Sequence, residues 1–110
     1  MLAVDVRQSL KQGETVEVGA SRWWRFAAET IEHHGDYLLA FVDGQVCVGA
    51  FEIVGAQPDE KADGKYVFEL KPASRFQWAL GRKLPLQAGR NPARVMTGQA
   101  LREFLDSDPR

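Results

Sequence analysis

The sequence predicts an α+β fold in which about six short strands form a small, curved, antiparallel, barrel-like sheet with two or three short helices. Three observations support this prediction. Two long apolar segments flank an Asp-Gly pair at residues 43–44, further short apolar runs alternate with turn residues, and the helical patterns are few and short. A chain of 110 residues with 45% hydrophobic content is expected to build one core.

The central hairpin is expected over residues 37–42 and 45–54, in the run YLLAFVDGQVCVGAFEIVG. Its Asp-Gly pair suits the positive φ values of a tight turn. Gly49 lies in the middle of the second strand, where a missing side chain allows a bulge, a bend or the close approach of another segment. We therefore expect this strand to curve.

Four further strands are expected around the hairpin. The N-terminal segment LAVDV alternates, with Leu2, Val4 and Val6 on one face, and should pair within the same sheet. After a polar loop over residues 55–64, the segment KYVFEL forms another strand. The remaining two candidates are the segments ETVEVG, at residues 14–19, and ARVMT, at residues 93–97.

Up to three short helices are expected. The segment AAETIEHH, residues 27–34, has small and apolar residues at helical spacing. The segment SRFQWALG offers Ser74 as N-cap and Gly81 as the stop, and a last helix is expected over Gly98–Asp106. Residues 1–106 should thus form a single domain, and residues 107–110 a disordered tail.

The formal net charge of −1 hides an uneven distribution of charged residues. Residues 71–102 carry a charge of +7 without a single acid, whereas residues 1–70 carry −6. Such asymmetry is typical of a surface that meets phosphate, although a chain of negative total charge does not attract polyanions at long range. Local contact with nucleic acid is therefore compatible with the composition, and strong non-specific binding is not expected.

The sequence lacks an apolar N-terminal run and a second cysteine, and these two features bear on the expected location and redox chemistry of the protein. The N-terminal segment contains Asp5 and Arg7, so it lacks the apolar run of a signal peptide or membrane span, and a cytoplasmic protein without membrane contact is expected. The single cysteine, Cys47, has no partner for an intramolecular disulfide or a CxxC metal site. We expect it to be a buried strand residue.

The order of several short motifs resembles that of a bacterial domain family. The motifs are an arginine and a tryptophan before a short helix, a DYLLAF strand, a glycine turn, a VGAF strand, an aromatic YVFEL strand, a GRKLP segment and a closing NPAR motif. They span roughly residues 16–96. Many members of the family carry a tryptophan after the VGAF-like strand, where this chain has EIVGAQPD.

The same order of elements is similar to the PUA-like group, which includes the ASCH, EVE and YTH domains. This resemblance implies a small β-barrel with helices at its rim. In several members of the group, a cleft lined by aromatic residues accepts RNA or a modified base. A PUA-like module that recognises RNA or DNA, including a modified base, is the function that the resemblance implies.

Two adjacent tryptophans in the stretch ASRWWRFAAE are expected to have opposite roles. In an extended segment Arg22, Trp24 and Phe26 point one way and Trp23 the other. Trp24, which occupies the family position, should pack with Phe26 under the hairpin. Trp23 is then the candidate platform for a stacked base, with Arg22 beside it for phosphate. A lid over an apolar patch or a subunit contact is the alternative for Trp23.

A second part of the predicted site comes from the basic half of the chain. Lys83, Arg90 and Arg94 lie near the GRKLP and NPAR motifs, although such residues also simply solvate a surface. Asn91 precedes a proline and should be held in an extended conformation, from which its amide either contacts a base edge or caps a turn. The predicted nucleic-acid site therefore contains Arg22, Trp23, Trp24, Lys83, Arg90, Asn91 and Arg94.

Catalysis is poorly supported by the sequence. The chain has no HxE, CxxC, GxSxG or phosphate-loop pattern, and the adjacent His33 and His34 should point in different directions at a helix end. No cofactor and no metal are expected. The sequence thus predicts a non-enzymatic binding module for a nucleic acid or modified base. A protein-interaction or homodimerisation module that uses the exposed aromatic residues is the alternative.

Overall fold

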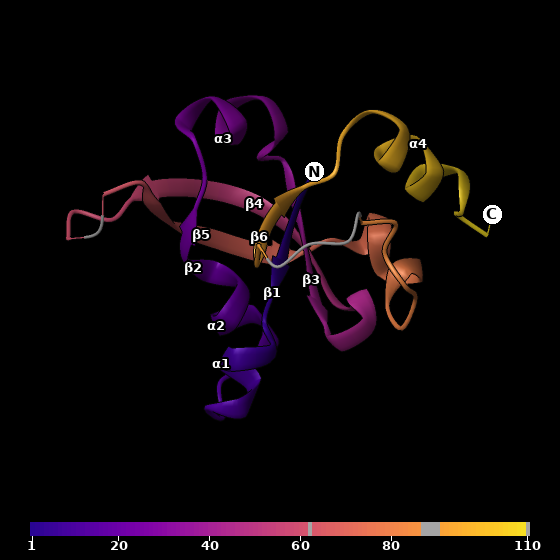
Figure 1. Ribbon diagram of the computed structural model, residues 1–110, viewed down its shortest axis with the longest axis horizontal. Coiled ribbons are helices and arrows are strands. Elements are labelled where there is room, and N and C mark those ends of the chain that lie inside the picture. Colours follow the sequence, from indigo (N-terminus) through magenta and orange to yellow (C-terminus); the bar gives the residue numbers. More distant parts are fainter. Residues whose placement is uncertain (62, 87–90, 110) are drawn as a thin grey trace.

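The computed structural model describes residues 1–61, 63–86 and 91–109, and it has the predicted fold class. Six strands form one sheet that curves into a nearly closed barrel, with short helices around it (Figure 1). The strands are β1 (Leu2–Asp5), β2 (Arg22–Arg25), β3 (Tyr37–Val42), β4 (Val46–Pro58), β5 (Lys65–Pro72) and β6 (Ala93–Val95). The helices are α1 (Arg7–Lys11), α2 (Val16–Ser21), α3 (Ala28–His34) and α4 (Gly98–Asp106), with the 3₁₀ helices η1 (Asp43–Gln45) and η2 (Ser74–Ala79).

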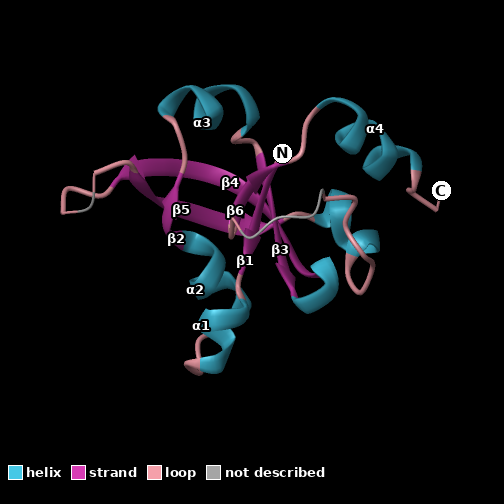
Figure 2. Ribbon diagram, in the orientation of Figure 1, coloured by secondary structure: helices cyan, strands magenta, loops and turns pink. Residues whose placement is uncertain are grey.

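The strand order is β2-β5-β4-β3-β1-β6. In Figure 2, α3 lies above the strands and α1 and α2 lie below them, but α2 and α3 pack against the same buried side chains, whereas α4 packs against others. Strand β1 runs parallel to β3 and antiparallel to β6, whereas the other described strand pairs are antiparallel. The parallel pair follows from the long crossover between β1 and β3, which contains α1, α2, β2 and α3.

The predicted antiparallel hairpin and its curvature are confirmed, because β3 and β4 pair antiparallel. The predicted two-residue turn is wrong: η1 forms the turn, Gln45 belongs to it and not to the strand, and the positive φ values fall on Gly44 (75°) and Gln45 (62°) and not on Asp43. Ala40 lies opposite Gly49 but Phe41 lies opposite Cys47, so one extra residue bulges from β4. A Cβ atom on Gly49 would lie 2.7 Å from side-chain atoms of Phe51 and Val16, so the missing side chain lets α2 approach the strand.

The structure contradicts the secondary structure predicted for two segments, residues 14–19 and residues 55–58. The segment ETVEVG is not a strand: Thr15 Oγ1 accepts a hydrogen bond from Val18 N at 3.2 Å and caps α2, whose Gly19 and Ala20 are buried. Its alternating valines resemble a strand, but the cap and the tertiary packing decide the local structure. Residues 55–58, expected in a loop, continue β4 and pair with β5 up to Pro58.

The other predicted elements are largely confirmed. Strands β1 and β6 form where expected, and α4 has the predicted bounds. The Ser74 cap is wrong, because η2 is preceded by Ala73 and no side chain caps it, whereas Gly81 follows with φ 83° as the expected stop. Ser107, assigned to the tail by the sequence, caps the end of α4 through its N–H to Glu103 O at 3.1 Å.

Buried side chains form two clusters on opposite faces of the central strands. In β3, Leu39 and Phe41 belong to the first cluster, which also contains Phe76 of η2 and Phe104 of α4. Leu38 and Ala40 belong to the second cluster, which contains Phe26, Phe51 and Phe68. Alternation along one strand therefore supplies both clusters.

Cys47 and Trp78 lie in or against the first cluster. Cys47 is buried, as expected, and burial raises the pKa of its thiol. Trp78 is partly buried and stacks on Phe104 with 4.9 Å between ring centroids.

Among the described residues, no helix has the length and apolar character needed to cross a membrane.

Candidate functional site

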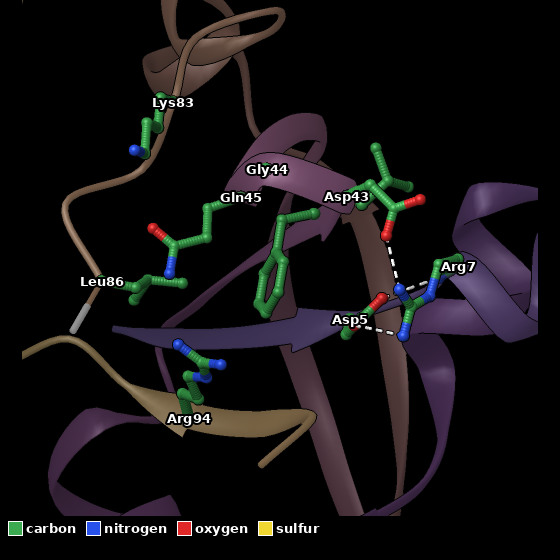
Figure 3. Close-up of a pocket in the computed structure, with 10 residues that line it drawn as sticks. Asp5, Arg7, Asp43, Gly44, Gln45, Lys83, Leu86 and Arg94 are labelled. Carbon is green, nitrogen blue, oxygen red and sulfur yellow. Dashed lines mark hydrogen bonds and ion pairs between the residues drawn. The ribbon is translucent and has the colours of Figure 1, made fainter. Parts of the chain in front are cut away.

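A groove of about 720 Å³ opens at the turn end of the hairpin (Figure 3). Its walls come from the end of β1, the start of α1, the end of β3, η1, the segment 83–86 and β6. These segments are far apart in the sequence, and the topology brings them together because β1 lies between β3 and β6. The groove therefore depends on the long-range pairing of β1.

Backbone hydrogen bonds place Lys83 at this groove. The segment after η2 runs antiparallel to the start of β4, with an isolated bridge between Val46 and Lys83. Cys47 N donates to Arg82 O, and Leu84 N donates to Gln45 O, each at 2.8 Å. Backbone pairing with the hairpin end therefore fixes the position of the GRKLP segment.

Gln45 fixes one wall of the groove. It adopts a left-handed conformation with φ 62°, which is unusual for a residue with a side chain. With its amide oriented to satisfy its neighbours, Nε2 donates to Leu84 O and Leu86 O, each at 3.2 Å. Side chain and backbone of the same residue therefore tie the turn to the segment 83–86.

Arg94 lies at the same end of the groove as Gln45, and contacts with Phe41 and Asn91 orient it. Its guanidinium carbon lies 5.7 Å from the centroid of the Phe41 ring, and its Nε donates to Asn91 O at 2.8 Å. Asn91 Oδ1 accepts from Ala93 N at 3.1 Å, so the side chain caps a turn, one of its two predicted roles. Asn91 thereby fixes the backbone that holds Arg94.

The far end of the groove carries a compensated charge cluster. Figure 3 shows Arg7 with Asp5 and Asp43 on one side and Lys83, Gln45, Leu86 and Arg94 on the other. Arg7 donates to Asp43 Oδ1 and lies 3.9 Å from Asp5 Oδ2. The hydrogen bond from Arg7 to Asp43 and the negative charges of both carboxylates raise the pKa of Arg7. Asp5 and Asp43, the two acids among the described residues that line the groove, both contact Arg7.

The groove adjoins a second hollow of about 390 Å³, which shares Gln45, Lys83 and Leu86 with it. Glu103 of α4 lines that hollow. A chain-like ligand that extends past Lys83 in this direction therefore meets one carboxylate.

The two tryptophans of β2 differ in burial, as predicted. Trp24 is partly buried against the second cluster, and its Nε1 donates to Gly19 O and Ala20 O, each at 3.1 Å. Trp23 is 54% exposed and lies at a bulge in the β2–β5 pairing, with φ 65°. The guanidinium of Arg22 lies 4.7 Å from the Trp23 ring centroid and pairs with Glu14 at 2.8 Å.

The structure divides the predicted site residues into two groups. Lys83 and Arg94 line one groove, with Asn91 behind Arg94. Arg22, Trp23 and Trp24 belong to β2, at the opposite end of the strand order from β6, and none of them lines this groove. Arg90 lies outside the described residues.

Sequence reasoning missed Arg7, Gln45 and Phe41 as groove residues. The Asp43-Gly44 pair was a signal for a turn, but it did not indicate which distant segments would pack beside that turn. Nothing in the sequence marks Gln45 as left-handed. An aromatic residue two positions before an Asp-Gly turn was the one available signal that a ring lies close to this end of the hairpin.

The polar groups of the groove are suited to bind an anion. They include the guanidinium of Arg94 and the ammonium group of Lys83, whose positive charges attract phosphate or carboxylate oxygens. Within the part of the chain that the structure describes, no three His, Cys, Asp or Glu side chains are grouped to hold a metal ion. His33 and His34 lie elsewhere, at the end of α3.

The chain matches no protein-family model, and neither a curated protein nor a solved structure is significantly similar to it. The resemblance to the PUA-like group therefore stays a prediction, and function is argued from the geometry of the groove.

Proposed function

We propose that this protein is a non-enzymatic binding module that holds a segment of nucleic acid, or a modified base, in the groove at the hairpin end. The observation that carries the proposal is the meeting of Lys83 and Arg94 in one groove whose two acids are both engaged by Arg7. Both cations come from the acid-free window of residues 71–102. Phosphate groups are the anions that such a surface meets in RNA and DNA.

The two cations contribute in different ways. Lys83 is exposed and carries a compact charge on a flexible stem, which suits a phosphate in many orientations. Arg94 is partly buried and oriented by Phe41 and Asn91, so its positive charge has a fixed position at the groove. Because the chain has a net charge of −1, we expect moderate affinity that depends on these local contacts.

The test is a titration of fluorescent single-stranded RNA and DNA, about eight nucleotides long, by fluorescence anisotropy. If two phosphates are neutralised, affinity should fall about sevenfold between roughly 50 and 200 mM salt. Lys83→Ala should weaken binding and flatten this salt dependence, because one phosphate contact is removed. Lys11→Ala, which removes the same charge from the exposed end of α1, is the matched control and should leave binding unchanged.

Equal effects of Lys83→Ala and Lys11→Ala would contradict binding in the groove. Absence of binding at the lower salt concentration would remove the nucleic-acid proposal altogether.

A protein-interaction or homodimerisation module is the second candidate function. It is favoured by Trp23, which is 54% exposed on a strand at the end of the sheet order. Exposed tryptophans are common anchors of protein interfaces, and an apolar contact depends little on salt. Sedimentation of the wild type and of Trp23→Ala tests it. A dimer that the substitution dissociates, together with no oligonucleotide binding at low salt, would favour this second function.

A further inference from the structure

We infer that the protein selects RNA over DNA through Glu103, whose carboxylate accepts a hydrogen bond from the ribose 2′-hydroxyl beside the phosphate that Lys83 holds. This inference rests on the proposed function and names the class of nucleic acid that the protein takes. It assigns a role to the second hollow of about 390 Å³, which shares Gln45, Lys83 and Leu86 with the groove.

The first support is the position of Glu103 beside Lys83, since both residues line the second hollow. Phe104, the next residue of α4, is buried in the first cluster and anchors the helix there. The end of the helix is bonded to the residue before Lys83, because Arg82 Nη1 donates to Ser107 O at 3.1 Å. The carboxylate and the ammonium group therefore belong to segments that the fold holds together.

The second support is the unused hydrogen-bonding capacity of the carboxylate. Glu103 is exposed, and its Oε1 accepts from Gln99 Nε2 at 3.2 Å. No other described residue donates to this carboxylate or forms an ion pair with it. Asp5 and Asp43, the described acids of the groove, are instead engaged by Arg7. Glu103 thus offers a charged acceptor beside the path of the ligand.

The third support is the chemistry of the two nucleic acids. A carboxylate beside the path of a strand repels its phosphates. The 2′-hydroxyl donates a hydrogen bond, and DNA lacks this group. The hydroxyl lies on the sugar carbon next to the one that bears the 3′ phosphate, so a phosphate at Lys83 brings it to the hollow that Glu103 lines. RNA therefore gains a hydrogen bond to a charged acceptor where DNA meets only repulsion.

The experiment compares three single strands of about eight nucleotides by fluorescence anisotropy. They are RNA, DNA, and an RNA analogue with fluorine in place of each 2′-hydroxyl. The base sequence is matched, so that contacts with the bases cancel, and the fluorinated strand keeps the sugar pucker of RNA without the donor. The wild type should bind RNA about tenfold more tightly than the other two strands, which corresponds to about 1.4 kcal/mol.

Substitutions of Glu103 separate the hydrogen bond from the charge. Glu103→Ala should weaken RNA binding and reduce the ratio of RNA to DNA affinity to about one. Glu103→Gln keeps an acceptor oxygen without the charge, so a ratio of about threefold should remain. Glu32→Ala removes the same charge from the exposed surface of α3, which lines neither hollow, and should leave the ratio as in the wild type.

Lys83→Ala tests the phosphate contact that the inference shares with the proposed function. It should weaken the binding of all three strands equally and leave the ratio unchanged, because the phosphate is common to them. Thermal unfolding of each variant checks that the fold is intact.

The outcomes distinguish this inference from the proposed function. If Glu103→Ala retains the preference for RNA, or if the fluorinated strand binds as tightly as RNA, selection by Glu103 is overturned. Groove binding still stands in either case when Lys83→Ala weakens all strands. If the wild type binds none of the strands, or if Lys83→Ala changes nothing, the proposed function fails and the selection of RNA with it.

Discussion

Two arginine–aromatic pairs in this protein have the same chemistry and opposite exposure. Arg22 lies 4.7 Å from the ring centroid of Trp23, and Arg94 lies 5.7 Å from that of Phe41. Trp23 is 54% exposed, whereas Phe41 is 3% exposed. In the first pair the aromatic ring is exposed to solvent, and in the second the ring is buried. The burial of the aromatic ring therefore decides whether the ring of such a pair is exposed at the protein surface.

The position of each aromatic residue in the sheet explains the difference. Phe41 belongs to β3, which has β4 on one side and β1 on the other, and its side chain lies in the first cluster of buried residues. Trp23 belongs to β2, which is the terminal strand of the order and pairs with β5. The bulge at Trp23 turns its side chain away from the buried face that Trp24 occupies.

The largest expected effect is on stability. Phe41→Ala should lower the free energy of unfolding by about 3–5 kcal/mol, because it removes a buried ring and the support of Arg94. Trp23→Ala should change it by no more than about 0.5 kcal/mol, as for an ordinary surface position. Urea midpoints of the two variants provide the comparison. Similar losses at both positions would mean that the two pairs do not differ in the way described.

A smaller effect is expected from backbone strain, since both regions contain a left-handed residue with a side chain. At Trp23 (φ 65°) and at Gln45 (φ 62°), the glycine variant should be more stable than the alanine variant by about 1 kcal/mol. Comparing glycine with alanine cancels the loss of side-chain contacts. Denaturant titration of the four variants measures the difference. Equal stability of the two variants at either position would show that the chain relaxes there without the left-handed turn.

The smallest expected effect concerns the acids that engage the arginines of the two regions. Asp43→Asn should release Arg7 toward the groove and make the salt dependence of oligonucleotide binding steeper by about 0.7 in the slope of log affinity against log salt. Glu14→Gln makes the same change beside Arg22, outside the groove, and should leave the slope as it is. An equal response to both substitutions would place the nucleic acid on both regions.

Much of the fold could be predicted because its signals are local. The hairpin follows from alternating apolar residues around Asp43-Gly44, and the bulge follows from Gly49 within a strand. The opposite environments of Trp24 and Trp23 agree with the prediction, but a bulge with left-handed φ at Trp23, and not the alternation of an extended segment, produces them. Helix α4 follows from its spacing of apolar residues.

The remaining features depend on contacts between distant segments. Helix α2 has the alternation of a strand, and only the cap by Thr15 and the packing of Gly19 and Ala20 make it helical. The sequence assigned Lys83 and Arg94 to one site with Arg22, Trp23 and Trp24, but it did not predict the groove at the hairpin turn, which, of these five residues, only Lys83 and Arg94 line. Their common location depends on the bridge between Val46 and Lys83 and on the pairing of β1 with β6, which no local pattern encodes.

The position of β1 between β3 and β6 has a consequence for the kinetics of folding. Leu2 pairs with Leu38 on one side and with Val95 on the other, so β1 gains its second neighbour only after β6 has been synthesised. Contacts of such wide sequence separation are costly in chain entropy, and domains rich in them fold in milliseconds to seconds. The hairpin of β3 and β4 can form early, while the wall that carries Arg94 forms only after β6 is present. The groove at the hairpin turn is therefore completed later in synthesis than the hairpin itself.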